Sequence, residues 1–132
     1  MKQPSSTNIL FIDDQKICHT VIELALMEHP SYKLLSAYSG REALDLLSKY
    51  YNQISVIISD IKMDDYSGNI LFQKIQSNSH YKNIPFILQS GFVDASTQLE
   101  YPDGTPVPVI YKPYNQQDLF DLIESVTSSS IY

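Results

Sequence analysis

Two short, mainly apolar runs, residues 9–12 and 56–59, constrain the fold of this chain more than any other feature. Neither run alternates apolar and polar residues, so each predicts a strand that is buried on both faces. Such strands are typical of parallel sheets that carry helices on both sides. Between and after them, apolar residues at helical spacing predict helices, so strands and helices follow one another in turn. The sequence therefore predicts an α/β fold.

Aspartates end both runs: Asp13 and Asp14 follow the first, and Asp60 follows the second. Because the carboxyl ends of parallel strands open onto one edge of a sheet, we expect these carboxylates to converge there. Two carboxylates about 5 Å apart repel by roughly 3 kcal/mol at an effective dielectric constant of about 20. A hard divalent cation would remove that cost. Mg²⁺ is the natural candidate, since it prefers a few carboxylate oxygens together with waters and a phosphate ligand.

Two further polar residues end predicted strands, Ser90 after residues 86–89 and Lys112 after residues 109–111. A hydroxyl can donate a hydrogen bond to a phosphoryl oxygen, and an ammonium group is a point charge beside a carboxylate or a phosphate. Phosphoryl transfer depends mainly on positioning and on neutralising charge. A carboxylate nucleophile, a metal, a hydroxyl and a lysine therefore suffice for it.

Over most of its length the chain resembles the receiver domain of two-component response regulators. The resemblance rests on four segments: Asp13-Asp14, residues 56–68 around Asp60, Ser90-Gly91 and Tyr111-Lys112-Pro113. It implies a flavodoxin-like, doubly wound (βα)5 fold whose five-stranded parallel sheet has the order 2-1-3-4-5.

The resemblance also implies a role for each acidic residue. Asp60 would accept a phosphoryl group from a phosphohistidine on a sensor histidine kinase or a histidine phosphotransfer protein. Mg²⁺ would be held by Asp14, Asp60 and the main-chain carbonyl of Lys62, while Asp13 would act mainly through water. The output would be a changed protein-interaction surface, read by a downstream protein or a fused output domain, without turnover of an external substrate.

Lys112 and Ser90 receive complementary roles from the same resemblance. Lys112 would pair with Asp60 and then with a phosphoryl oxygen, and Ser90 would bond another phosphoryl oxygen. Gly91 would leave room for the phosphoryl group. The peptide bond between Lys112 and Pro113 is expected to be cis, an isomer found in only about 5–6% of such bonds in folded proteins.

The fourth crossover, residues 91–108, departs from the regular pattern because prolines and a glycine crowd its second half. Proline inside a helix costs about 3 kcal/mol or more. Any helix is therefore expected to lie within residues 94–100, with a tight turn at residues 102–104. Val109 stands where many receivers place a switching Tyr or Phe. We expect phosphorylation to rearrange this crossover while the protein stays mainly monomeric.

Two other classes of protein remain open from the sequence. A phosphatase of the haloacid dehalogenase type also uses Asp, Mg²⁺, Ser or Thr, and Lys, but it requires a second Asp two positions after the nucleophile, where this chain has Lys62. The other alternative is a degenerate interaction module that is never phosphorylated. Val109, the irregular crossover, and Asp64 in place of a proline that is usual in receivers are the departures that favour it.

Length and composition agree with a single domain of 132 residues, with a core at about 7–126 and tails at 1–6 and 127–132. A net charge of −6 argues against a nucleic-acid-binding surface. One cysteine excludes an internal disulfide. No apolar run reaches membrane-spanning length, and the first residues lack the apolar stretch of a signal peptide, so the cytoplasm is the expected location.

Local patterns also predict several boundaries. Ser39 and Glu42 form a capping-box pattern at the start of a helix, and Asn115 is the expected N-cap of the last helix. In the first helix, Ile17 and Leu24 are expected to widen the apolar face. Residues 107–110 predict the fifth strand.

Overall fold

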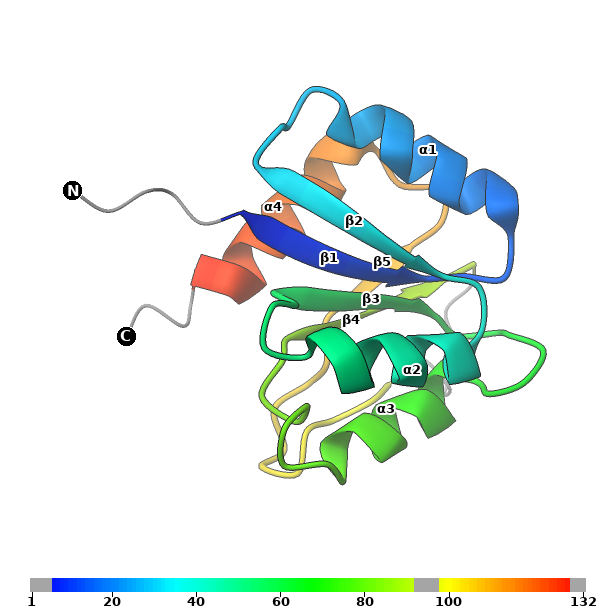
Figure 1. Cartoon of the computed structure of the whole chain (residues 1–132), viewed down its shortest axis with the longest axis vertical. Coiled ribbons are helices and arrows are strands. Elements are labelled where there is room, and N and C mark those ends of the chain that lie inside the picture. Colours follow the sequence, from blue (N-terminus) through cyan, green and yellow to red (C-terminus); the bar gives the residue numbers. More distant parts are fainter. Residues whose placement is uncertain (1–5, 92–97, 129–132) are drawn as a thin grey trace.

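The computed structural model describes residues 6–91 and 98–128. Its centre is a five-stranded parallel sheet in which the strands have the order β2-β1-β3-β4-β5, as predicted. Helices α1 and α4 cover one face of this sheet, and α2 and α3 cover the other (Figure 1). The strands are β1 (Thr7–Ile12), β2 (Tyr32–Ala37), β3 (Val56–Asp60), β4 (Phe86–Ser90) and β5 (Val109–Tyr111), and the helices are α1 (Lys16–Leu26), α2 (Gly40–Tyr50), α3 (Gly68–Gln76) and α4 (Gln116–Ser128).

The sheet divides the apolar core into two clusters because successive side chains of a strand point to opposite faces. In β3, Ile57 belongs to the cluster shared with α2 and α3, whereas Ile58 belongs to the cluster shared with α1 and α4. All five residues of β3 are buried. The expectation that this strand is buried on both faces is therefore confirmed.

Both predicted helix caps are present. The Ser39 hydroxyl accepts a hydrogen bond from the Glu42 N–H (3.1 Å), and the Asn115 side chain accepts one from the Asp118 N–H (2.7 Å). The Glu42 carboxylate accepts from the Tyr38 N–H, one residue before the cap. Each such cap contributes about 1 kcal/mol to stability.

The buried face of α1 is narrower than its apolar face. Ile17 and Leu24 are 65% and 60% exposed, so the part of the apolar face that they widen does not pack on the core. The helix ends at Leu26, and its buried residues are His19, Ile22, Ala25 and Leu26. The apolar residues of α1 occupy a wider arc than the sheet covers, and the remainder forms an exposed apolar surface.

The described part of the fourth crossover, residues 98–108, contains no helix. It folds back on itself instead: the Tyr101 N–H donates to the Thr105 carbonyl (2.8 Å), and the Val107 N–H donates to the Leu99 carbonyl (2.9 Å). The turn predicted at residues 102–104 lies at the tip, where Gly104 has a φ of +90°. Residues 92–97, which include most of the segment where a helix was allowed, lie outside the described part of the chain.

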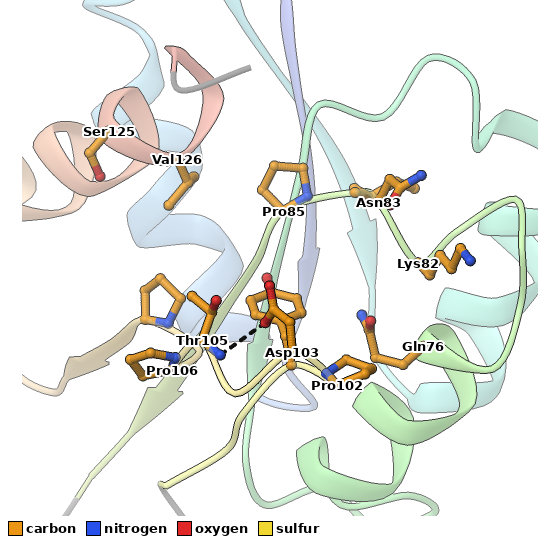
Figure 2. Close-up of a pocket in the computed structure, with 13 residues that line it drawn as sticks. Gln76, Lys82, Asn83, Pro85, Pro102, Asp103, Thr105, Pro106, Ser125 and Val126 are labelled. Atoms are coloured by element: carbon orange, nitrogen blue, oxygen red, sulfur yellow. Dashed lines mark hydrogen bonds between the residues drawn. The ribbon is translucent and has the colours of Figure 1, made fainter. Parts of the chain in front are cut away.

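The fifth strand begins at Val109 instead of residue 107, which corrects the prediction. Val107 is buried, but its N–H bonds to Leu99 within the hairpin and not to β4. Beneath this hairpin, at the amino-terminal end of the sheet, lies a cavity of about 560 Å³ bordered by Pro85, Pro102 and Val126 (Figure 2). It lies at the end of the sheet opposite the acidic residues.

Candidate functional site

The three acidic residues predicted to converge lie together at the carboxyl end of the sheet. Asp13 and Asp14 follow β1, and Asp60 ends the neighbouring strand β3, which pairs with β1 in parallel register. One carboxylate oxygen from each of the three lies within 4.8 Å of the others. Asp13 is fully buried and Asp60 is buried, while Asp14 is half-buried. The topology alone brings these carboxylates to one place.

Lys112 enters this cluster from the loop after β5. Its Nζ lies 3.2 Å from Asp13 Oδ2 and 3.3 Å from Asp60 Oδ1, so one ammonium group bridges the two buried carboxylates. The Lys112 N–H donates to the Ser90 carbonyl (2.7 Å), which anchors the lysine backbone to the end of β4. The bond between Lys112 and Pro113 is cis, as predicted.

The charges of the cluster depend on one another. Burial raises the pKa of Asp60, and the nearby Lys112 ammonium only partly offsets this. Burial lowers the pKa of Lys112, but the attraction of Asp60 and Asp13 outweighs it and leaves the pKa of Lys112 raised. Lys112 therefore stays protonated at neutral pH, and Asp60 gains its counter-charge from this lysine.

The remaining predicted site residues surround the same edge. Ser90 is fully buried at the end of β4, the strand beside β3. Lys62 is exposed and borders, with Asp14, Asp60 and Asp64, an opening of about 300 Å³ above the acidic cluster. Gly91 is exposed, and among the described residues other than its chain neighbours no atom lies within 4 Å of the place a Cβ would take.

The acidic cluster suits Mg²⁺. The carboxylates of Asp13, Asp14 and Asp60 each offer a hard oxygen atom within 4.8 Å of the others, and Mg²⁺ prefers a few such ligands over a complete protein cage. Both carboxylate oxygens of Asp13 accept hydrogen bonds: Oδ1 accepts from the Gln15 N–H (2.9 Å), and Oδ2 accepts from Lys112.

Three residues of the site were not predicted as part of it. The Gln89 Nε2 donates to Asp13 Oδ2 (3.0 Å), and the Tyr114 hydroxyl donates to Gln89 Oε1 (3.0 Å). His19 Nε2 lies 2.7 Å from the Asp13 carbonyl oxygen. Gln89 could have been predicted, because it is a polar residue near the end of an apolar strand. His19 could not, because its position in the sequence indicates only that it belongs to a helix with an apolar face.

A latch formed by Asp65 fixes the loop that follows β3. Its carboxylate accepts hydrogen bonds from the Gly40 and Arg41 N–H groups at the start of α2, each 2.9 Å long, and from the Tyr66 N–H (2.7 Å). Burial raises the pKa of Asp65, but these backbone N–H groups outweigh it and lower the pKa overall. At Gly40, an added Cβ would clash with Cδ2 of the Tyr66 ring. Tyr66 in this loop therefore packs directly against the backbone of Gly40, the first residue of α2.

Comparison with known proteins matches this arrangement to one family. The sequence model of the response regulator receiver domain matches residues 9–124. A two-component response regulator-like protein of Oryza sativa, PRR37, is 26% identical over 124 residues, which are 94% of this chain and 17% of that protein. A probable cyclic di-GMP phosphodiesterase of Vibrio cholerae is 30% identical over 114 residues, 86% of this chain and 25% of the phosphodiesterase. The chain thus spans a minor part of these two relatives.

Solved structures agree with the fold. A response regulator receiver domain protein of Clostridium thermocellum has a TM-score of 0.81 at 27% identity, with 94% of this chain and 96% of that chain covered. The chemotaxis response regulator CheY4 of Vibrio cholerae, at 24% identity and a TM-score of 0.79, covers 92% of this chain and shares the fold. Within residues 6–91 and 98–128, no helix is both long enough and apolar enough to cross a membrane.

Proposed function

Because the chain belongs to the response regulator receiver domain family, we propose that it is a phosphorylation-dependent signalling domain in which Asp60 accepts the phosphoryl group. The observation that carries this proposal is the convergence of Asp13, Asp14 and Asp60, two of which, Asp13 and Asp60, are bridged by the ammonium group of Lys112. The phosphoryl donor would be a phosphohistidine on a sensor histidine kinase or a histidine phosphotransfer protein.

The proposed transfer uses groups that are already close to one another. A carboxylate oxygen of Asp60 attacks phosphorus, so an O–P bond forms while the N–P bond to histidine breaks and the imidazole nitrogen keeps the electron pair. Lys112, which starts 3.3 Å from Asp60, then pairs with a phosphoryl oxygen, and the Ser90 hydroxyl donates to another. Asp14, Asp60 and the main-chain carbonyl of Lys62 would hold Mg²⁺, with Asp13 acting through water. When bound, the metal neutralises negative charge on the carboxylates and the phosphoryl oxygens.

Labelling with a small phosphodonor tests the assignment. Incubation with Mg²⁺ and acetyl phosphate should add the mass of one phosphoryl group to the protein, and Asp60→Asn should abolish this addition. Asp45→Asn, which changes an exposed aspartate on α2, is the matched control and should be labelled like the wild type. Labelling that persists in Asp60→Asn would contradict the proposal.

Assays of phosphate release and of Mg²⁺ binding, run beside the labelling, separate the two alternatives. Continuous release of phosphate from a generic phosphate ester would indicate a phosphatase, and a protein that neither binds Mg²⁺ nor accepts label would indicate an interaction module that is never phosphorylated.

The exposed apolar surface of α1 supports a place for the phosphodonor protein to dock. Ile17 and Val21 border, with Lys112 and Tyr114, a shallow groove of about 270 Å³ beside the acidic cluster. A partner docked there would bring its phosphohistidine close to Asp60. Val21→Glu should then slow transfer from a histidine phosphotransfer protein while labelling by acetyl phosphate stays at the wild-type rate. Equal slowing with both donors would contradict this docking site.

We further infer that the chain is one domain, monomeric, and located in the cytoplasm, and that it signals through protein contact to a downstream protein or a fused output domain. Residues 98–108 form turns, and Val109 is not aromatic. Both observations support a signalling surface that does not depend on a regular helix within residues 98–108. Beryllofluoride, a phosphoryl mimic, should then change hydrogen exchange in residues 98–108 without causing dimerisation in sedimentation. Tight dimerisation on adding beryllofluoride would contradict the inference.

A further inference from the structure

Gln89 is a fully buried polar side chain at the end of the otherwise apolar strand β4. A buried amide costs free energy unless its donor and its acceptor are both satisfied. Both ends of this amide are used: Nε2 donates to Asp13 Oδ2, and Oε1 accepts from the Tyr114 hydroxyl, each at 3.0 Å. The side chain therefore connects the acidic cluster to the loop that follows β5.

The orientation of the Gln89 amide follows from its two neighbours. Asp13 Oδ2 already accepts a hydrogen bond from the Lys112 ammonium group and so acts as an acceptor, and the NH₂ end of the amide must therefore face it. Tyr114 then meets the carbonyl end and must donate its proton. Burial raises the pKa of Tyr114 to about 12, so its hydroxyl keeps that proton throughout the neutral pH range. Each of the two hydrogen bonds thus has one possible direction.

Asp13 is fixed by three groups from three parts of the chain. The Gln15 N–H holds Oδ1, while Gln89 and Lys112 share Oδ2 at 3.0 and 3.2 Å. Without Gln89, Lys112 would be the only one of these groups on Oδ2, and the carboxylate could turn toward its ammonium. That rotation would take the Asp13 oxygens out of their present position beside Asp14 and Asp60.

We propose that Gln89 and Tyr114 are positioning residues that hold the Asp13 carboxylate in the orientation in which it supports the Mg²⁺ site through water, Gln89 directly and Tyr114 by fixing the Gln89 amide. This inference rests on the proposed function, since it concerns the same Mg²⁺ site. Residues that hold metal-binding groups in place typically change metal affinity by about 10- to 100-fold when they are mutated.

Titration with Mg²⁺ alone, followed by calorimetry, tests the inference without any phosphodonor. Gln89→Met keeps the length of the side chain but removes both hydrogen bonds, and it should weaken Mg²⁺ binding about tenfold, which corresponds to about 1.4 kcal/mol. Tyr114→Phe removes one hydroxyl and should weaken binding by a smaller factor. Tyr50→Phe, at an exposed tyrosine of α2, is the matched control and should bind like the wild type.

The double variant distinguishes positioning from a general loss of packing. If Tyr114 acts only through Gln89, Gln89→Met with Tyr114→Phe should bind Mg²⁺ as Gln89→Met does, since coupled residues are not additive. Effects that multiply, or wild-type affinity in either single variant, would overturn the inference. If Gln89→Met does not fold, the Mg²⁺ affinity of Tyr114→Phe tests the inference: weaker binding than the wild type supports it, and wild-type binding overturns it.

The result also separates this inference from the proposed function. A wild-type protein that binds Mg²⁺ with the expected variant pattern but is not labelled at Asp60 would defeat the phosphoacceptor assignment and leave the positioning role supported. A wild-type protein that binds no Mg²⁺ would overturn both.

Discussion

Gly68 provides a sharp test of how closely the phosphoacceptor strand and the next helix are packed. A Cβ at this position would lie 2.7 Å from the Asp60 carbonyl oxygen, 3.0 Å from Ile61 Cα and 3.0 Å from Leu88 Cδ1. Two of these three atoms belong to the backbone, which cannot rotate away as a side chain can. The Gly68 N–H also donates to the Ile61 carbonyl (2.8 Å), and this hydrogen bond holds Gly68 close to the backbone that follows Asp60. Gly68→Ala must therefore displace the loop after β3.

The cost can be estimated from these contacts. Inserting a methyl group into a tightly packed site typically costs about 1–3 kcal/mol, and the two backbone contacts at Gly68 place its cost in the upper part of that range, about 2–3 kcal/mol. Alanine also stabilises the folded state relative to glycine by up to about 1 kcal/mol, because it restricts the unfolded chain and favours helix. Gly68→Ala should thus lower the free energy of unfolding by about 1–2 kcal/mol, which corresponds to a fall in Tm of roughly 4–8 °C for a domain of this size.

Urea denaturation, with unfolding followed by tyrosine fluorescence, measures this difference. Gly91→Ala is the matched control, because within residues 6–91 and 98–128 no atom beyond its chain neighbours lies within 4 Å of its Cβ position, and its stability should stay within about 0.5 kcal/mol of the wild type. Gly68→Ala should also accept phosphate from acetyl phosphate more slowly, since the backbone of Asp60 is displaced. A Gly68→Ala protein as stable and as readily labelled as the wild type would refute the reasoning.

Three further outcomes follow from the electrostatics and the caps. Asp60→Asn without Mg²⁺ should raise Tm at pH 7, because burial raises the folded-state pKa of Asp60 and its ionised form therefore costs stability. The gain should disappear as pH falls below the ordinary value of about 3.9, and a gain that persists at lower pH in thermal unfolding would contradict this cause. Asp65→Asn should cost about 1 kcal/mol at neutral pH in urea denaturation. Since the pKa of Asp65 is lowered in the folded state, the advantage of the wild type should fade as pH falls through that lowered pKa, and a pH-independent loss would argue against a charge effect. Asn115→Ala should cost about 1 kcal/mol and speed hydrogen exchange in the first turn of α4, and unchanged exchange there would show that the cap contributes little.

The convergence of the acidic residues was predictable because it follows from short-range pattern and parallel topology, whereas the order of the strands was predictable only from the family resemblance. An apolar run such as residues 56–59 specifies a strand buried on both faces, and a strand-ending residue such as Asp60 must lie at the carboxyl edge of the sheet. The position of Lys112 beside it was predictable from the family resemblance.

Other features depend on contacts between distant residues and leave little local trace. Helical periodicity placed Ile17 on an apolar face, but it cannot tell how much of that face the sheet covers. The start of the fifth strand was misplaced because Val107 pairs with Leu99 in a hairpin. Likewise, nothing in the sequence around Asp65 indicates that its partners are the backbone groups of Gly40 and Arg41.

The Asp65 latch has a consequence for the construction of chimeric signalling proteins. The loop after β3 and the first residues of α2 form a single transferable unit, although residues 40–41 and 65–66 are far apart in the sequence. A graft that replaces the loop alone would leave the Gly40 and Arg41 N–H groups without their carboxylate acceptor. A graft that replaces the helix alone with one lacking glycine at position 40 would place a side chain where Tyr66 lies. Exchange of both segments together preserves the fit, so the boundaries of interchangeable modules in this domain do not coincide with its helices and strands.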